Sequence, residues 1–124
     1  MLVVVAIAVA GAAGALARYA ADRLIEHHLF TVFPWSTFAI NVSGCLLAGA
    51  VVSALVDRHG APSWLRTGLV VGFLGAYTTF STFAQETHDL FAGDHVVLGL
   101  ANVAGSFLCG VGAVVAGAAI GRAL

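Results

Sequence analysis

The stretch GAYTTFSTF, residues 75–83, concentrates groups that could bind an ion. Four hydroxyl side chains and two phenyl rings fall within six consecutive positions: Thr78, Thr79, Phe80, Ser81, Thr82 and Phe83. Hydroxyl donors and the positive edges of phenyl rings suit an anion, whereas main-chain carbonyls exposed by a break in a helix suit a cation. The stretch therefore predicts a pore or an ion site, and its composition is compatible with either sign of charge.

The same stretch follows the apolar run LVVGFL and lies inside a segment long enough to cross a membrane. Single Ser and Thr residues in membrane helices commonly bond back to the i−4 carbonyl, while Phe faces lipid. Four hydroxyls in five positions, preceded by Gly75, weaken the helix together. We therefore predict a helix broken at mid-membrane, which is tolerated only where the backbone is buried in protein or lines a cavity.

Other polar residues lie inside apolar runs. Asn41 lies one to two turns inside the second run, where its amide needs a neighbouring helix or a permeating species as partner. Asn102 and Ser106 lie one turn apart in the last run and share a helix face. Arg18 follows a long uncharged run, so it either faces a cavity or extends to the headgroups beside Asp22.

The elements that position these residues are four predicted membrane helices in one domain, residues 1–124. The chain is 60% hydrophobic and 9% charged, which is too apolar for a soluble domain of 124 residues. Because each run reaches the ~20 residues that a bilayer requires, and lipid offers no partner for backbone groups, we expect an all-α integral membrane protein. The predicted spans are about 2–25, 36–56, 64–86 and 95–121.

Several functions are disfavoured by where the titratable residues stand. All acidic residues fall at or beyond the predicted span ends: Asp22, Glu26, Asp57, Glu86, Asp89 and Asp94. A proton-coupled transporter needs a carboxylate within a span, and none is expected there. The histidines fall in connections and no nucleophile–base arrangement is visible, so we expect neither a metal cluster nor an enzyme. A net charge of −1 without any Lys gives no indication of a nucleic-acid partner.

Positive charge is nearly balanced between the two sides of the membrane. Arg58, Arg66 and Arg122 fall on one side, and Arg18 and Arg23 on the other. Such a weak bias is compatible with insertion in both orientations. Small residues at four-residue spacing in the third and fourth spans predict closely packed helices without an internal aqueous channel. Any permeating species is therefore expected to cross between subunits.

Three segments carry a resemblance to a known family. GFLGAYTTFSTFAQE (72–86) resembles the signature of the Fluc (CrcB) family of fluoride-selective ion channels, and GAAGALARY (11–19) and FPWSTFAINVSG (33–44) stand in matching positions. The resemblance implies a multi-pass protein of the bacterial plasma (inner) membrane that exports cytoplasmic fluoride passively and so confers fluoride resistance. It also implies a dual-topology antiparallel dimer with two fluoride pathways along the subunit interface. A small four-span drug/proton antiporter is the alternative, and it would need an embedded carboxylate.

The resemblance also implies roles for residues of the pathway. Phe80 and Phe83 resemble the phenylalanines whose ring edges face the permeating fluoride. Asn41 resembles the amide donor of the pore, and Arg18 resembles the arginine of the vestibule. The hydroxyl track of the family is matched by Thr79, Thr82 and Ser106.

The resemblance further implies a bound ion and shows two departures from the family pattern. Gly75 and Thr78 match positions whose main-chain carbonyls hold a structural Na⁺ at the dimer interface, and Glu86 matches the acid that closes the signature. The family usually has Gly where this chain has Ser36, and Tyr where it has Asn102. Either difference could modify the pathway, and Asn102 raises the alternative that a paralogous subunit replaces the second copy.

Overall fold

The regular structure of the described residues, 1–29, 31–55 and 60–124 of this computed structural model, is entirely helical. Four of its helical segments are long and apolar enough to cross a membrane: Leu2–His28, Trp35–Leu55, Ser63–Ala92 and Val96–Ala123. The expectation of an all-α, multi-pass membrane protein is therefore confirmed. Asp57 and Arg58, which entered the charge and orientation arguments, lie outside the described residues.

The third membrane segment is interrupted. It consists of four helical pieces: α3 (Ser63–Thr67), a π-helical stretch η1 (Gly68–Leu74), α4 (Gly75–Tyr77) and α5 (Phe80–Ala92). Thr78 and Thr79 between α4 and α5 have extended backbone angles, with ψ of 158° and 107°. The expected bend in this helix is thus present. The bend does not occur at Gly75, which keeps helical angles (φ −63°, ψ −33°).

The end of this segment lies further along the chain than the composition suggests. Residues after Glu86 were expected in a polar connection, yet α5 continues to Ala92 and the turn to α6 contains only residues 93–95. Thr87 and Leu90 are buried on one face of α5 at i, i+3 spacing, and α5 packs against α6. Packing of this face keeps a polar stretch helical beyond the predicted span end.

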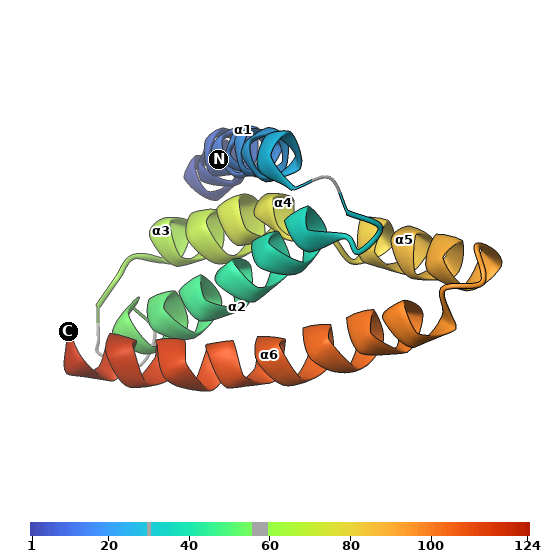
Figure 1. Cartoon of the computed structure of the whole chain (residues 1–124). Coiled ribbons are helices and arrows are strands. Elements are labelled where there is room, and N and C mark those ends of the chain that lie inside the picture. The colour runs from blue at the N-terminus through green and yellow to red at the C-terminus, as the bar shows by residue number, and fades with distance from the viewer. Residues whose placement is uncertain (30, 56–59) are drawn as a thin grey trace.

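The helices form two closely packed pairs. α2 (Trp35–Leu55) packs along α6 (Val96–Ala123), and α1 (Leu2–His28) packs across α3, η1 and α4, as Figure 1 shows. Glycines permit both approaches, because a Cβ on Gly117 would collide with the Leu46 carbonyl and one on Gly14 with the Phe73 carbonyl. Such contacts of backbone with backbone are the usual means by which membrane helices associate. α5 then diverges from α4 and closes against the N-terminal half of α6 (Figure 1).

Candidate functional site

The interruption of the third span is stabilised by a side chain from α2. The Asn41 amide nitrogen donates to the Thr79 carbonyl (3.0 Å), and the Thr79 backbone N–H donates to the Asn41 carbonyl oxygen (2.8 Å). The carboxamide thus supplies one donor and one acceptor to a residue that has left the helical pattern. Since an unsatisfied backbone group is costly in lipid, this pair of bonds allows the break to exist at membrane depth.

Hydroxyl groups complete the two helix ends at the break. The Thr79 hydroxyl oxygen accepts from the Thr82 backbone N–H (3.3 Å) and lies 2.8 Å from the Thr82 hydroxyl, so Thr79 is the N-cap of α5. The Thr78 hydroxyl donates to the Leu74 carbonyl (2.9 Å) at the end of α4. Hydroxyl groups therefore bond to backbone groups on both sides of the break. Thr79 is buried, whereas Thr82 is exposed.

Beside the break, α2, α5 and α6 enclose a groove of about 420 Å³, which we call the phenylalanine groove. Its lining residues are Asn41, Cys45, Thr78, Phe80, Phe83, Val103, Ser106 and Phe107. Four residues predicted to form the fluoride pathway therefore line one cavity: Phe80, Phe83, Asn41 and Ser106. The two ring centroids at the start of α5 lie 5.7 Å apart, and Phe80 is 79% exposed. No Asp, Glu, Lys or Arg belongs to this described lining.

The remaining predicted pathway residues lie outside the lining of the phenylalanine groove. Thr79 and Thr82 stand at the break itself, where their hydroxyls cap α5. Arg18 is half-buried on α1, and among the described residues it makes no hydrogen bond or ion pair. Of its two alternatives, the one that places it beside Asp22 is therefore not accompanied by an ion pair. The structure thus brings Asn41, Phe80, Phe83 and Ser106 together in one groove, keeps Thr79 and Thr82 at the adjacent break, and leaves Arg18 apart.

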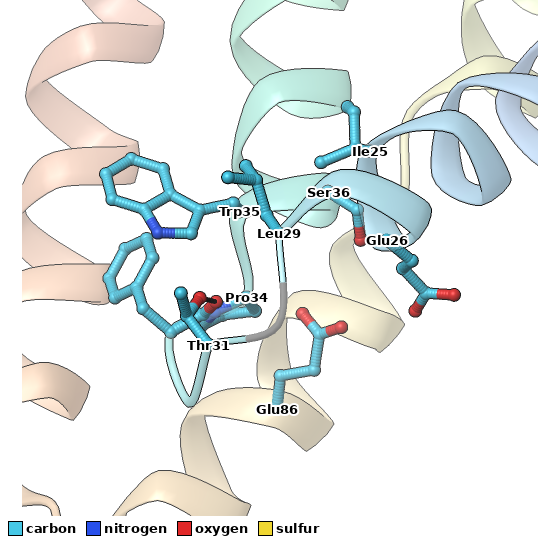
Figure 2. A pocket seen from close by; sticks show the side chains of 9 residues that line it. Ile25, Glu26, Leu29, Thr31, Pro34, Trp35, Ser36 and Glu86 are labelled. Atoms are coloured by element: carbon cyan, nitrogen blue, oxygen red, sulfur yellow. Dashed lines mark hydrogen bonds between the residues drawn. The ribbon is translucent and has the colours of Figure 1, made fainter.

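Glu86 belongs to a different cavity, of about 300 Å³, at the connection between α1 and α2. Figure 2 shows its side chain extending from α5 towards this connection, with Ser36 on the opposite wall. Oε1 of Glu86 accepts a hydrogen bond from the Thr37 hydroxyl (2.9 Å), while Oε2 is buried without a partner among the described residues. The acid that ends the signature is therefore half-buried, with one oxygen enclosed. It lies within α5, which continues to Ala92, and not at the predicted span end, and it does not face the phenylalanine groove.

Three lining residues of the phenylalanine groove were missed in the sequence: Cys45, Val103 and Phe107. Cys45 lies one turn after Asn41 on α2, and Val103 and Phe107 flank Ser106 on α6. Helical spacing would have found them, because residues three and four apart share a face. Cys45 lies four residues after Asn41, Val103 lies three before Ser106, and Phe107 lies four after Val103. Their apolar character concealed them among many similar residues.

The fold and this groove define a small four-span integral membrane protein with an interrupted helix beside a partly polar cavity. The chain belongs to the CrcB-like protein, Camphor Resistance (CrcB), family, whose model matches residues 5–118. The expected membership is thereby confirmed.

Similar proteins are known from several bacteria, and each is named a fluoride-specific ion channel FluC. The chain is 37% identical over 116 residues to that of Maridesulfovibrio salexigens, covering 94% of this chain and 92% of the relative. It is 47% identical over 106 residues to that of Acidithiobacillus ferrooxidans, covering 85% and 84%. It is 50% identical over 97 residues to that of Acidobacterium capsulatum, covering 77% and 74%. These names describe channels and neither enzymes nor antiporters.

The Asn41–Thr79 interaction leads to a stability prediction. Replacement Asn41→Ala leaves the Thr79 N–H and carbonyl without their partners, at about 1–3 kcal/mol for each buried group. We expect a markedly lower unfolding temperature in detergent, measured by circular dichroism. Cys45→Ala is the matched control, because it truncates another half-buried lining residue of α2 that makes no hydrogen bond within the described chain. Equal unfolding temperatures for the two variants would contradict the role assigned to Asn41.

Proposed function

We propose that this chain forms a passive, fluoride-selective channel in a bacterial plasma membrane and lowers the cytoplasmic fluoride concentration. The observation that carries the proposal is the phenylalanine groove, where Phe80, Phe83, Asn41 and Ser106 meet in a chain of this family. A channel is sufficient for export, because an inside-negative membrane potential drives an anion outward by ~2.3 kcal/mol per charge per 100 mV.

The groups in the groove suit a small anion that has lost part of its water. Asn41 uses one N–H for the Thr79 carbonyl, so the second N–H of its amide is available to an ion. The Ser106 hydroxyl and the positive ring edges of Phe80 and Phe83 add further favourable contacts. In this proposal Thr79 and Thr82 continue the polar track at the break. Arg18 attracts anions at the vestibule. Glu86 is the acid that closes the signature segment 72–86.

A second subunit is proposed to close the groove. The Phe80 side chain is 79% exposed and Phe107 is 69% exposed, so one chain leaves the pathway open along one side. The near balance of arginines between the two sides favours an antiparallel partner, either a second copy of this chain or a paralogous subunit. Two copies in opposite orientations would then enclose two equivalent pathways at their interface.

A structural Na⁺ at this interface fits the backbone of the break. In a continuous helix the Thr79 N–H would donate to the Gly75 carbonyl, but here it donates to Asn41. Likewise the Thr82 N–H, which would serve the Thr78 carbonyl, donates to the Thr79 hydroxyl. The two carbonyls that the proposal assigns to Na⁺ are thus among those that lose their helical donors at the break, and Gly75 is exposed on the chain surface. Two subunits would offer four such oxygens to one cation.

The proposed activity is tested by fluoride efflux from liposomes that contain only the purified protein. We expect fast, passive efflux that chloride does not inhibit. Absence of efflux from correctly folded protein would refute the proposal for this chain acting alone. Restoration of efflux by a paralogous subunit would then identify a heteromeric channel.

Replacement of either phenylalanine by isoleucine tests the role of the ring edges. Phe80→Ile and Phe83→Ile keep apolar bulk but remove the positive edge, so we expect folded protein with fluoride efflux reduced at least tenfold. Val103→Ile, which changes an apolar lining residue of the same groove, is the control and should conduct. Efflux at the wild-type rate from both Phe variants would leave packing as the function of the rings.

Added terminal charge tests the antiparallel arrangement. Two lysines after Leu124 bias insertion towards a cytoplasmic C-terminus, since juxtamembrane positive charge sets topology. We expect this variant to lose fluoride efflux when expressed alone and to regain it with an oppositely biased copy. Full efflux from a uniformly oriented population, verified by labelling of the C-terminus, would exclude antiparallel assembly.

Substitutions at the break test the Na⁺ site. A Cβ on Gly75 would meet only the Val70 carbonyl, at 3.8 Å, so within one chain this position accommodates a Cβ without a clash. Gly75→Val would nevertheless obstruct two subunits that approach at this point. We expect Gly75→Val to reduce dimer yield and fluoride efflux, whereas Thr78→Ser keeps the hydroxyl and stays active. Equal behaviour of both variants, and no loss of wild-type efflux after prolonged exchange of sodium for a large organic cation, would refute a central ion.

A further inference from the structure

Asn102 lies behind the phenylalanine groove and connects two of the elements that line it. The residue is 1% exposed and is absent from the lining itself. Its amide nitrogen donates to the Thr87 hydroxyl of α5 (2.9 Å), and its carbonyl oxygen accepts from the Ser106 hydroxyl of α6 (3.4 Å). A single buried carboxamide therefore links α5 to the one hydroxyl that α6 contributes to the groove.

The orientation of this carboxamide is determined by Thr87. The Thr87 hydroxyl donates its only proton to the Phe83 carbonyl (2.7 Å), so towards Asn102 it can only accept. The nitrogen of Asn102 must consequently face Thr87, and its oxygen must face Ser106. The hydrogen bonds of Thr87 alone therefore determine which end of the Asn102 carboxamide is the nitrogen and which is the oxygen.

This orientation determines where the Ser106 proton points. The hydroxyl of Ser106 has one proton, and in this arrangement the proton is directed to Asn102 and away from the groove. What Ser106 then presents to the groove is lone pairs, which repel an anion. To bind an anion, Ser106 must withdraw its proton from Asn102, and the length of 3.4 Å makes this bond a weak one.

We propose that Asn102 is a positioning residue that holds the Ser106 proton out of the phenylalanine groove and releases it when an anion passes. The inference rests on the proposed anion conduction and specifies which residue sets the affinity at one step. By competing with the anion for a single proton, Asn102 keeps binding at Ser106 weak. Weak binding favours fast conduction, because an ion must leave its site as readily as it enters.

Two substitutions outside the groove remove this competition by different routes. Asn102→Leu deletes the acceptor for the Ser106 proton while keeping a similar side-chain volume. Thr87→Val deletes the acceptor for the Asn102 nitrogen, so the carboxamide can turn its N–H groups towards Ser106 and free the Ser106 proton. Both variants should lower the half-saturating fluoride concentration for efflux about fivefold, which corresponds to one weak hydrogen bond.

The test is a double-mutant cycle with Ser106→Ala, read as half-saturating fluoride concentration and maximal efflux rate separately. In the Ser106→Ala background, Asn102→Leu and Thr87→Val should change the half-saturating concentration less than twofold. Effects of equal size in both backgrounds, or weaker fluoride binding in the single variants, would overturn the inference and assign Asn102 to packing alone. Thr87→Val keeps the test decisive if Asn102→Leu fails to fold. A wild-type protein without efflux would refute the proposed function of this chain acting alone, and this inference with it. If the wild type conducts but the effects of the Asn102 and Thr87 substitutions do not depend on Ser106, only the inference is refuted.

Discussion

The arrangement of this protein depends on the two hydrogen bonds between the Asn41 carboxamide and the backbone of Thr79. A chain that leaves the helical pattern inside a membrane exposes donors and acceptors that lipid cannot satisfy. A carboxamide resembles a peptide group, since it offers both a donor and an acceptor, and it can replace the missing helical partners at one residue. Because Asn41 belongs to α2, these bonds also fix the break relative to the α2–α6 pair.

The positions of the groove residues follow from this attachment. Thr79, held by Asn41, caps α5, so Phe80 is the first residue of that helix and Phe83 lies in its first turn. α5 leaves the break in a new direction and packs on α6, where Thr87 and Asn102 form a buried contact. The phenylalanine groove lies between the two points of attachment, Asn41 on α2 and Asn102 on α6. The positions of its walls therefore depend on two carboxamides, Asn41 at the break and Asn102 at the contact of α5 with α6.

The sequence predicts the helices and the interruption well, because both depend on local properties. Apolar runs of sufficient length specify membrane helices, and a dense cluster of hydroxyls beside Gly75 weakens one of them. Pairings between distant residues were not predictable in the same way. The contact of Asn41 with Thr79 joins residues 38 positions apart, and it depends on how α2 lies against α4 and α5. The continuation of α5 past Glu86 likewise depends on packing against α6, which periodicity within one segment does not reveal.

The absence of charge from the described lining of the groove is consistent with rapid passage of an anion. A carboxylate 4 Å from the ion would repel it with an interaction energy of about 4 kcal/mol at an effective dielectric constant of 20. A guanidinium at the same distance would attract it with an interaction energy of the same size and so hold it in place. Neutral donors are weaker, at about 0.5–1.5 kcal/mol each, so several can replace lost water without trapping the ion. Glu86 follows Phe83 by less than one turn of α5, yet its side chain accepts a hydrogen bond from Thr37 in the first turn of α2 and lines the cavity at the α1–α2 connection. The bond to Thr37 thus directs the nearest acid of α5 into another cavity, and the groove keeps only neutral donors and ring edges.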